Sequence, residues 1–130
     1  LMRATPDLRV LLWFDSQPAC ALFTTAITEA EIRFGLARLP HGQRRDDLTA
    51  AADAMFVQDF DGRVLPFDRA AARNYATIRA TRRRRGLGEP EADMQIAAIA
   101  KSRGAEVVTG NVSDFDGTDL RLVNPWTTAA

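Results

Sequence analysis

Apolar side chains along the 130-residue chain recur at helical spacing in some segments and form short β-branched runs in others. Spacings of three and four residues indicate amphipathic helices, and short apolar runs between turn residues indicate strands. Helices are predicted over 6–17 and 29–39, then one after Gly42 that includes Leu48 to Phe56, one after Asp68, and one over 88–104. Strands are predicted over 21–27, 63–67, 105–109 and 120–123, with a turn or short helix over 110–117.

Residues that begin or end helices lie where this pattern requires them. Thr28 and Asp68 precede helical segments, and their side-chain oxygens would accept hydrogen bonds from free backbone N–H groups. Gly104 follows the last helix and suits the left-handed backbone that commonly ends one. Because strands alternate with helices, we predict an α/β fold of three layers, α/β/α, with a mainly parallel sheet. Residues 1–130 form a single domain, because the length suits one core.

Composition excludes several kinds of chemistry. The chain is 46% hydrophobic, 26% charged and has zero formal net charge, as expected for an ordinary globular protein. Cys20 is the only cysteine and His41 the only histidine, so a Cys–His zinc site and a Ser–His triad are not expected. The lone cysteine fits a reducing cytoplasm, and no apolar run approaches the roughly 20 residues of a membrane-spanning helix.

Three acids fall near the predicted ends of parallel strands. Glu31 follows the strand over 21–27, Asp114 follows the strand over 105–109, and Asp93 begins the helix that precedes that strand. In parallel sheets, functional groups gather beyond the carboxyl ends of the strands. Carboxylates held together repel one another, and Mg²⁺ relieves this repulsion. The acids therefore predict metal-assisted hydrolysis of a phosphodiester.

Each acid also has a purely structural interpretation. Glu31 completes a Thr28-x-x-Glu capping box, in which its carboxylate would bond the Thr28 N–H group. Asp93 suits the first turn of a helix, where the backbone dipoles favour negative charge. Asp114 suits a turn after Asn111. The spacing of each acid alone leaves both interpretations open.

Three longer motifs narrow the choice. The segments are "TTAITEAEIRFGLARLP", "EADMQIAAIAKSRGAEVVTGNVSDF" and "LVNPW". Together they closely resemble the PIN-domain ribonucleases, especially the VapC-type toxins of bacterial toxin–antitoxin pairs. The resemblance implies a Mg²⁺- or Mn²⁺-dependent endoribonuclease whose metal site includes Glu31, Asp93 and Asp114. It also implies an antitoxin partner, an RNA substrate and a homodimer.

The resemblance assigns supporting roles to nearby residues and shows one departure. Thr28 belongs to the helix-start motif, Asn111 stands where many relatives have a further Asp, and Glu91 is a modulator or a cap. Relatives begin with a strand and an aspartate of the form "LDTNVLSE", whereas this sequence starts at "LMR". That strand is central in the family, and its Asp is a metal ligand. We therefore expect the chain as given to be weakly active or inactive.

A run of arginines forms the strongest charge block. Arg82, Arg83, Arg84 and Arg85 follow Arg79 near the end of a predicted helix, close in sequence to Asp93. They would contact RNA phosphates. The alternative is a solvated helix end, where cations are favoured by the helix dipole.

Two further classes of protein remain as rivals. One is a PIN-like domain without catalysis that binds only an antitoxin or RNA, which the absent first strand favours. The other is a phospho-receiver domain, which also places acids at strand ends. That fold requires an acidic pair after its first strand and a Lys near its last, and neither is visible here.

Overall fold

The computed structural model describes residues 12–13 and 15–127. Most of the predicted helix over 6–17 lies outside these residues, but Leu12, Trp13 and Asp15 are helical, and the chain turns at Ser16. The described helices are η1 (Ala19–Ala21), α2 (Ala26–Ala37), α3 (Gln43–Ala54), η2 (Met55–Asp59), α4 (Arg69–Arg84), α5 (Glu91–Ser102) and η3 (Val112–Phe115). The strands are β1 (Thr24–Thr25), β2 (Val64–Leu65), β3 (Val107–Val108) and β4 (Leu122–Val123).

The strands form two parallel pairs. β1 pairs with β2 and β3 pairs with β4, each through two residues of register. The predicted α/β class with parallel strands is therefore confirmed. The prediction of one continuous sheet differs from the described residues, where no pairing joins β1 to β3.

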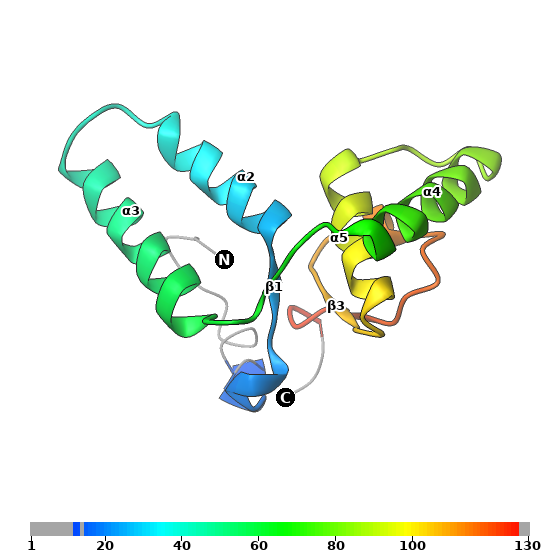
Figure 1. The fold of residues 1–130 in the computed structure, drawn as a ribbon, viewed down its shortest axis with the longest axis horizontal. Helices are drawn as coiled ribbons and strands as arrows, with labels where there is room; N and C mark the ends of the chain where they lie inside the picture. The colour runs from blue at the N-terminus through cyan, green and yellow to red at the C-terminus, as the bar shows by residue number, and fades with distance from the viewer. Residues whose placement is uncertain (1–11, 14, 128–130) are drawn as a thin grey trace.

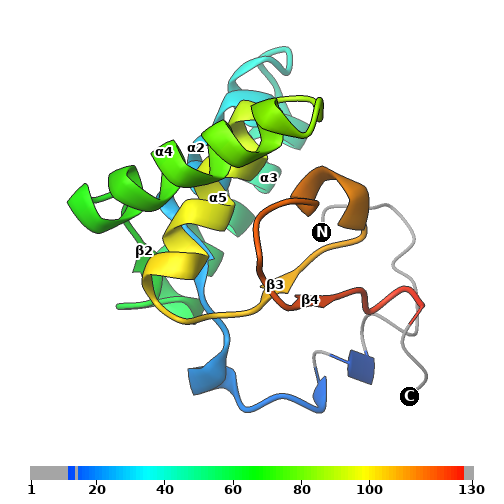
Figure 2. The same cartoon turned by 90° about the vertical axis from the view of Figure 1, so that its right-hand side faces the viewer.

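The helices lie in two groups on either side of β1. Figure 1 shows α2 and α3 side by side as one arm, and α4 and α5 packed together on the other side of β1. Figure 2 shows β3 and β4 below the helices, with the chain returning from η3 into β4. Among the described residues, no helix combines the length and the hydropathy needed to span a lipid bilayer.

The start of α2 differs from the prediction. The strand ends at Thr25, whose side-chain oxygen accepts a hydrogen bond from the Thr28 N–H group at 3.0 Å. Thr25 is therefore the N-cap and α2 begins at Ala26, so the prediction of Thr28 as N-cap was wrong. Because Thr25 already binds the Thr28 N–H group, Glu31 is not needed for a capping box. Glu31 lies instead in the second turn of α2.

A widened turn ends the predicted helix that follows Gly42. The regular helix α3 stops at Ala54, and η2 continues it as a π-helix, in which the Phe60 N–H group reaches the Met55 carbonyl at 2.9 Å. The predicted apolar face survives this change, because Ala52 and Phe56 are buried against Leu36 of α2.

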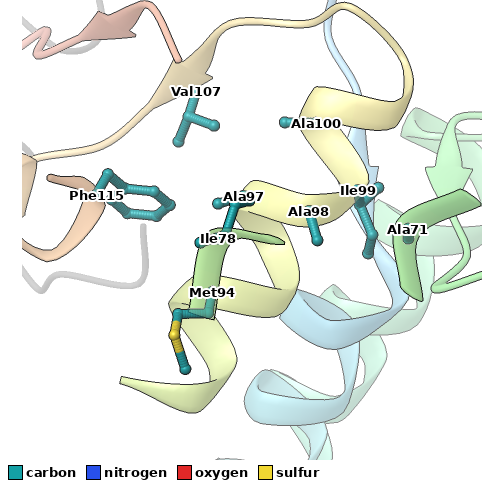
Figure 3. Close-up of a cluster of buried hydrophobic side chains, with 9 residues drawn as sticks. All are labelled: Ala71, Ile78, Met94, Ala97, Ala98, Ile99, Ala100, Val107 and Phe115. Atoms are coloured by element: carbon teal, nitrogen blue, oxygen red, sulfur yellow. The ribbon is translucent and has the colours of Figure 1, made fainter. Parts of the chain in front are cut away.

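The main core surrounds α5. Its buried residues from α5 pack against α4, β3 and η3, and this cluster comprises Ala71, Ile78, Met94, Ala97, Ala98, Ile99, Ala100, Val107 and Phe115. Figure 3 shows Phe115 and Val107 on one side of α5 and Ala71 on the other. Small alanine side chains let neighbouring elements approach α5 closely. The predicted boundaries Asp68 and Gly104 are confirmed, since Asp68 caps α4 and Gly104 has a φ of 64°.

Candidate active site

Three separate elements carry the predicted acids. Asp93 lies in the first turn of α5, Asp114 lies in η3 after β3, and Glu31 lies in the second turn of α2 after β1. Asp93 and Asp114 are partly buried, whereas Glu31 is exposed. Both α2 and η3 follow the carboxyl end of a strand, and packing against α5 brings them to the same end of the fold. The acids therefore approach one another although they are far apart in sequence.

The electrostatic state of Asp93 shows how closely they approach. Burial raises the pKa of the Asp93 carboxyl above its ordinary value of 3.8, and the neighbouring Asp114 raises it further through its charge and a hydrogen bond. The charge of Glu31 also raises this pKa, whereas the charge of the Arg82 guanidinium lowers it. The electrostatic effects of both Asp114 and Glu31 therefore act on Asp93.

A capping role alone does not account for Asp93. A carboxylate in the first turn of a helix is normally stabilised in its charged form by the helix dipole. The pKa of Asp93 moves in the opposite direction, because burial and two other acids disfavour its charge. A group held in such an unfavourable place is a candidate for function.

The chemistry of these donors fits a hard divalent cation. Carboxylate oxygens are the ligands that Mg²⁺ favours, and a cation would relieve the repulsion at Asp93. The geometry fits less completely, because no three His, Cys, Asp or Glu side chains within residues 12–13 and 15–127 are arranged to hold a metal ion. Asp93 and Asp114 are close enough for Asp114 to raise the pKa of Asp93, so they are the candidate pair of ligands. Glu31 would have to move closer to share the same ion.

The three supporting residues have local partners of their own. The Thr28 hydroxyl lies 2.9 Å from the Thr25 hydroxyl at the start of α2. The Asn111 carbonyl accepts a hydrogen bond from the Asp114 N–H group at 3.1 Å, which fixes the start of η3. Glu91 is the exposed first residue of α5. None of these three is among the groups that shift the pKa of Asp93.

The arginine run divides into two parts. Arg83, Arg84 and Arg85 are exposed, as the predicted RNA-contacting surface requires. Arg83 also bonds both carboxylate oxygens of Glu89 at 3.0 Å. Hydrogen bonds from Arg79 and then Arg83 lower the pKa of Glu89, so this acid neutralises part of the charge.

Arg82 corrects the prediction. Its side chain is only 3% exposed, so it cannot belong to a surface that contacts RNA phosphates. The helical spacing already contained this signal, because Arg82 follows Ile78 by four residues and shares the buried face of α4. The charge of the neighbouring arginines concealed it. Arg82 is also the group near Asp93 that the sequence interpretation missed.

Comparison with known proteins agrees with this arrangement. The family model of the PIN domain matches residues 7–119 of this chain. The chain belongs to the PIN-domain family. Among its relatives, VapC ribonuclease Y4jK of Sinorhizobium fredii is 41% identical over 97% of this chain and 90% of that protein. Toxin FitB of Neisseria gonorrhoeae is 36% identical over 96% of this chain and 90% of that protein.

The PIN-domain fold is shared with solved structures. The crystal structure of FitAcB from Neisseria gonorrhoeae matches with a TM-score of 0.91 and 35% identity. The match covers 98% of this chain and 91% of that one. The predicted resemblance to PIN-domain ribonucleases of the VapC type is therefore confirmed.

Proposed function

We propose that this PIN-domain chain is a cytoplasmic, Mg²⁺- or Mn²⁺-dependent endoribonuclease that acts as the toxin of a toxin–antitoxin pair. The observation that carries the proposal is that the partly buried Asp93 has a raised pKa, to which both Asp114 and Glu31 contribute. The relatives named VapC ribonuclease and toxin FitB support the same activity.

The acids and the arginines would have separate roles in RNA cleavage. Asp93 and Asp114 would hold the divalent ion, and Glu31 would complete the ligand set from α2. When bound, the ion would polarise the phosphodiester and activate water for attack. Arg83, Arg84 and Arg85 would bind the phosphates of the RNA backbone, and these contacts would not distinguish one base from another.

Metal-dependent cleavage of RNA tests this proposal. We would compare the 130-residue chain with an extended chain, which adds the family's first strand and its aspartate. We expect the extended chain to cleave a structured RNA in the presence of Mg²⁺ or Mn²⁺. EDTA should abolish this cleavage, and excess metal should restore it. Cleavage that persists without metal, or no cleavage by either protein, would contradict the proposal.

An antitoxin and a second copy of the chain are the proposed protein partners. Large apolar side chains are exposed on the arm formed by α2, α3 and η2, where Phe34 is 64% and Val57 is 66% exposed. Contact with another protein would remove these apolar side chains from water. In the cleavage assay, the cognate antitoxin should suppress the activity.

Arg84 provides a test of RNA binding separate from catalysis. We expect Arg84→Ala to weaken RNA binding. The slope of log affinity against log salt concentration should fall by the amount expected for about one phosphate contact. Arg83→Ala should act in the same direction but less, because Glu89 already binds Arg83. Fluorescence anisotropy between roughly 50 and 200 mM salt would measure both effects.

The matched control for these variants is Arg121→Ala. Arg121 has a side chain that is 87% exposed and lies at β4, away from α4. Its loss should leave the salt dependence unchanged, and all three variants should keep the cleavage rate at saturating RNA. An equal effect of Arg84→Ala and Arg121→Ala would refute a defined RNA-binding surface.

A binding module without catalysis is the second candidate function. The observation that favours it is that the three acids do not already form a ready metal cluster in the described part of the chain. Such a module would bind the antitoxin or RNA with the same affinity in metal and in EDTA, and would cleave nothing.

A further inference from the structure

A buried arginine stands at the end of α4, next to the candidate site. Arg82 lies on the same face as Ala71 and Ile78, and its side chain is nearly as buried as theirs. Arginine is almost never buried to this degree unless its five N–H donors find acceptors. The acceptors of Arg82 therefore indicate what the residue does.

The guanidinium of Arg82 joins two segments that carry the acids. Its Nε donates to the Gly88 carbonyl at 2.8 Å, in the loop that leads into α5 and Asp93. One terminal nitrogen donates to the carbonyl of Asp116, just after η3 and Asp114. A single planar group thus fixes the entry to one acid-bearing element and the exit from the other.

The chain packs tightly around this connection. Gly117 has a φ of 78°, and a Cβ atom placed on it would lie 3.3 Å from Cγ of Arg82 and 3.1 Å from Nη1 of Arg85. Glycine is required there both by the backbone angle and by the close approach of the two arginines. The Thr118 hydroxyl, which is buried, donates to the Phe115 carbonyl at 2.6 Å and holds the same turn closed.

The acceptors that hold the Arg82 guanidinium are uncharged. Among the ion pairs found in the described residues, none involves Arg82, and the acceptors named above are neutral carbonyl groups. These contacts join the two acid-bearing segments without pairing Arg82 with either acid.

We propose that Arg82 is a positioning residue, which sets the separation of Asp93 and Asp114 by holding the Gly88 and Asp116 carbonyls in one guanidinium fork. This inference rests on the proposed metal-dependent function. It assigns Arg82 no contact with RNA and no part in the chemical step.

The choice of ion distinguishes positioning from charge. Mg²⁺ requires nearly ideal octahedral geometry, whereas Ca²⁺ accepts flexible geometry and variable ligand number. If the separation of Asp93 and Asp114 changes, the affinity of the site for Mg²⁺ should therefore fall more than its affinity for Ca²⁺. A change in charge alone would move the affinities for both ions in the same direction and by similar factors.

The experiment measures ion binding by three forms of the 130-residue chain without RNA. Electron paramagnetic resonance would count free Mn²⁺, and competition would give the affinities for Mg²⁺ and Ca²⁺. Arg82→Lys keeps the charge but cannot span both carbonyls with one rigid fork. Arg82→Met removes charge and donors while keeping an apolar stem. Arg121→Met is the exposed control, since the side chain of Arg121 is 87% exposed.

We expect both Arg82 variants to lose about 10- to 100-fold in Mg²⁺ affinity relative to Ca²⁺, as is typical when a group that orients metal ligands is changed. Hydrogen exchange should quicken over residues 111–118, while Arg121→Met behaves as the unmodified chain. An unchanged Mg²⁺ to Ca²⁺ ratio in the folded variants would overturn the proposal. Loss of cooperative unfolding in both variants would also overturn it, because Arg82 would then be only structural.

The two proposals fail in different ways. The proposed function fails if the unmodified chain binds no Mn²⁺, or if Asp93→Asn leaves its Mn²⁺ binding unchanged. This outcome does not depend on Arg82. Hydrogen exchange over 111–118 still reports in that case whether Arg82 holds the two segments. If the unmodified chain binds Mg²⁺ and the Arg82 variants bind it equally well, only the positioning role fails.

Discussion

Asp93→Asn is expected to reduce metal-dependent RNA cleavage by the extended chain by more than about a hundredfold, because a metal ion in such a site contributes several kcal/mol to the transition state. The substituted amide would keep the shape of the side chain, but it would offer one neutral oxygen where the ion requires a charged ligand. The loss should appear in the rate at saturating RNA, since Asp93 is not proposed to bind the RNA backbone.

The folded state should not suffer from this change. The asparagine amide can donate a hydrogen bond to the Asp114 carboxylate and carries no charge against Glu31. Stability without metal should therefore stay level or rise. Asp119→Asn is the matched control, because that acid has a side chain that is 96% exposed and its φ of 58° suits asparagine.

The pH dependence of stability provides a second control. The pKa of Asp93 is raised in the folded state, so the folded chain binds this proton more tightly than the unfolded chain. Its contribution is fully present below the ordinary value of 3.8 and is lost as the pH rises through the raised pKa. Asp93→Asn should remove this component. Equal cleavage by the Asp93→Asn and Asp119→Asn variants would end the assignment of Asp93 to the metal site.

Ile99→Ala is expected to lower the free energy of unfolding by about 2–5 kcal/mol, a large part of the total for a small domain. Ile99 is fully buried in the main core, near Ala71 of α4, as Figure 3 shows. Its α5 neighbours Ala98 and Ala100 have side chains too short to fill the resulting cavity, so collapse around it is limited.

Urea unfolding would measure this effect as a lower midpoint with an unchanged slope. Ile99→Val removes one methyl group and should cost only about 0.5–1.5 kcal/mol. Val57→Ala, at an exposed position of η2, should change stability by less than about 0.5 kcal/mol. A similar loss for Ile99→Ala and Val57→Ala would show that α5 is not the centre of the core.

Periodicity predicted the elements whose packing is regular. The helical spacing after Asp68 predicted an inward face of Ala71, Ala72, Tyr75 and Ile78. Ala71, Tyr75 and Ile78 do pack into the core, whereas Ala72 is exposed. Asp68 and Gly104 marked true boundaries. These features could be predicted because each depends on residues within one or two turns of the same helix.

The prediction failed where neighbouring residues compete for one role. Thr25 and Thr28 can both cap a helix, and the β-branched run to Ile27 favoured a longer strand than the structure contains. The π-helical turn of η2 depends on one extra residue per turn, which no apolar spacing reveals. Arg82 was misassigned because the charged run outweighed its helical position.

The candidate site could be predicted only as a set of acids. Their sequence positions place Glu31, Asp93 and Asp114 after strands or at a helix start, and these positions say nothing of distance. Their approach depends on α2 and η3 both packing against α5. The arginine that joins the Gly88 and Asp116 carbonyls became visible only in three dimensions.

The most direct test of the central claim is a crystal structure with Mn²⁺, in which anomalous scattering locates the ion. We predict an anomalous peak within about 2.0–2.3 Å of carboxylate oxygens from both Asp93 and Asp114, with the Glu31 side chain turned toward it. A Mn²⁺ ion bound elsewhere, or acids that keep the same arrangement in saturating Mn²⁺ with no ion between them, would contradict the proposed metal site.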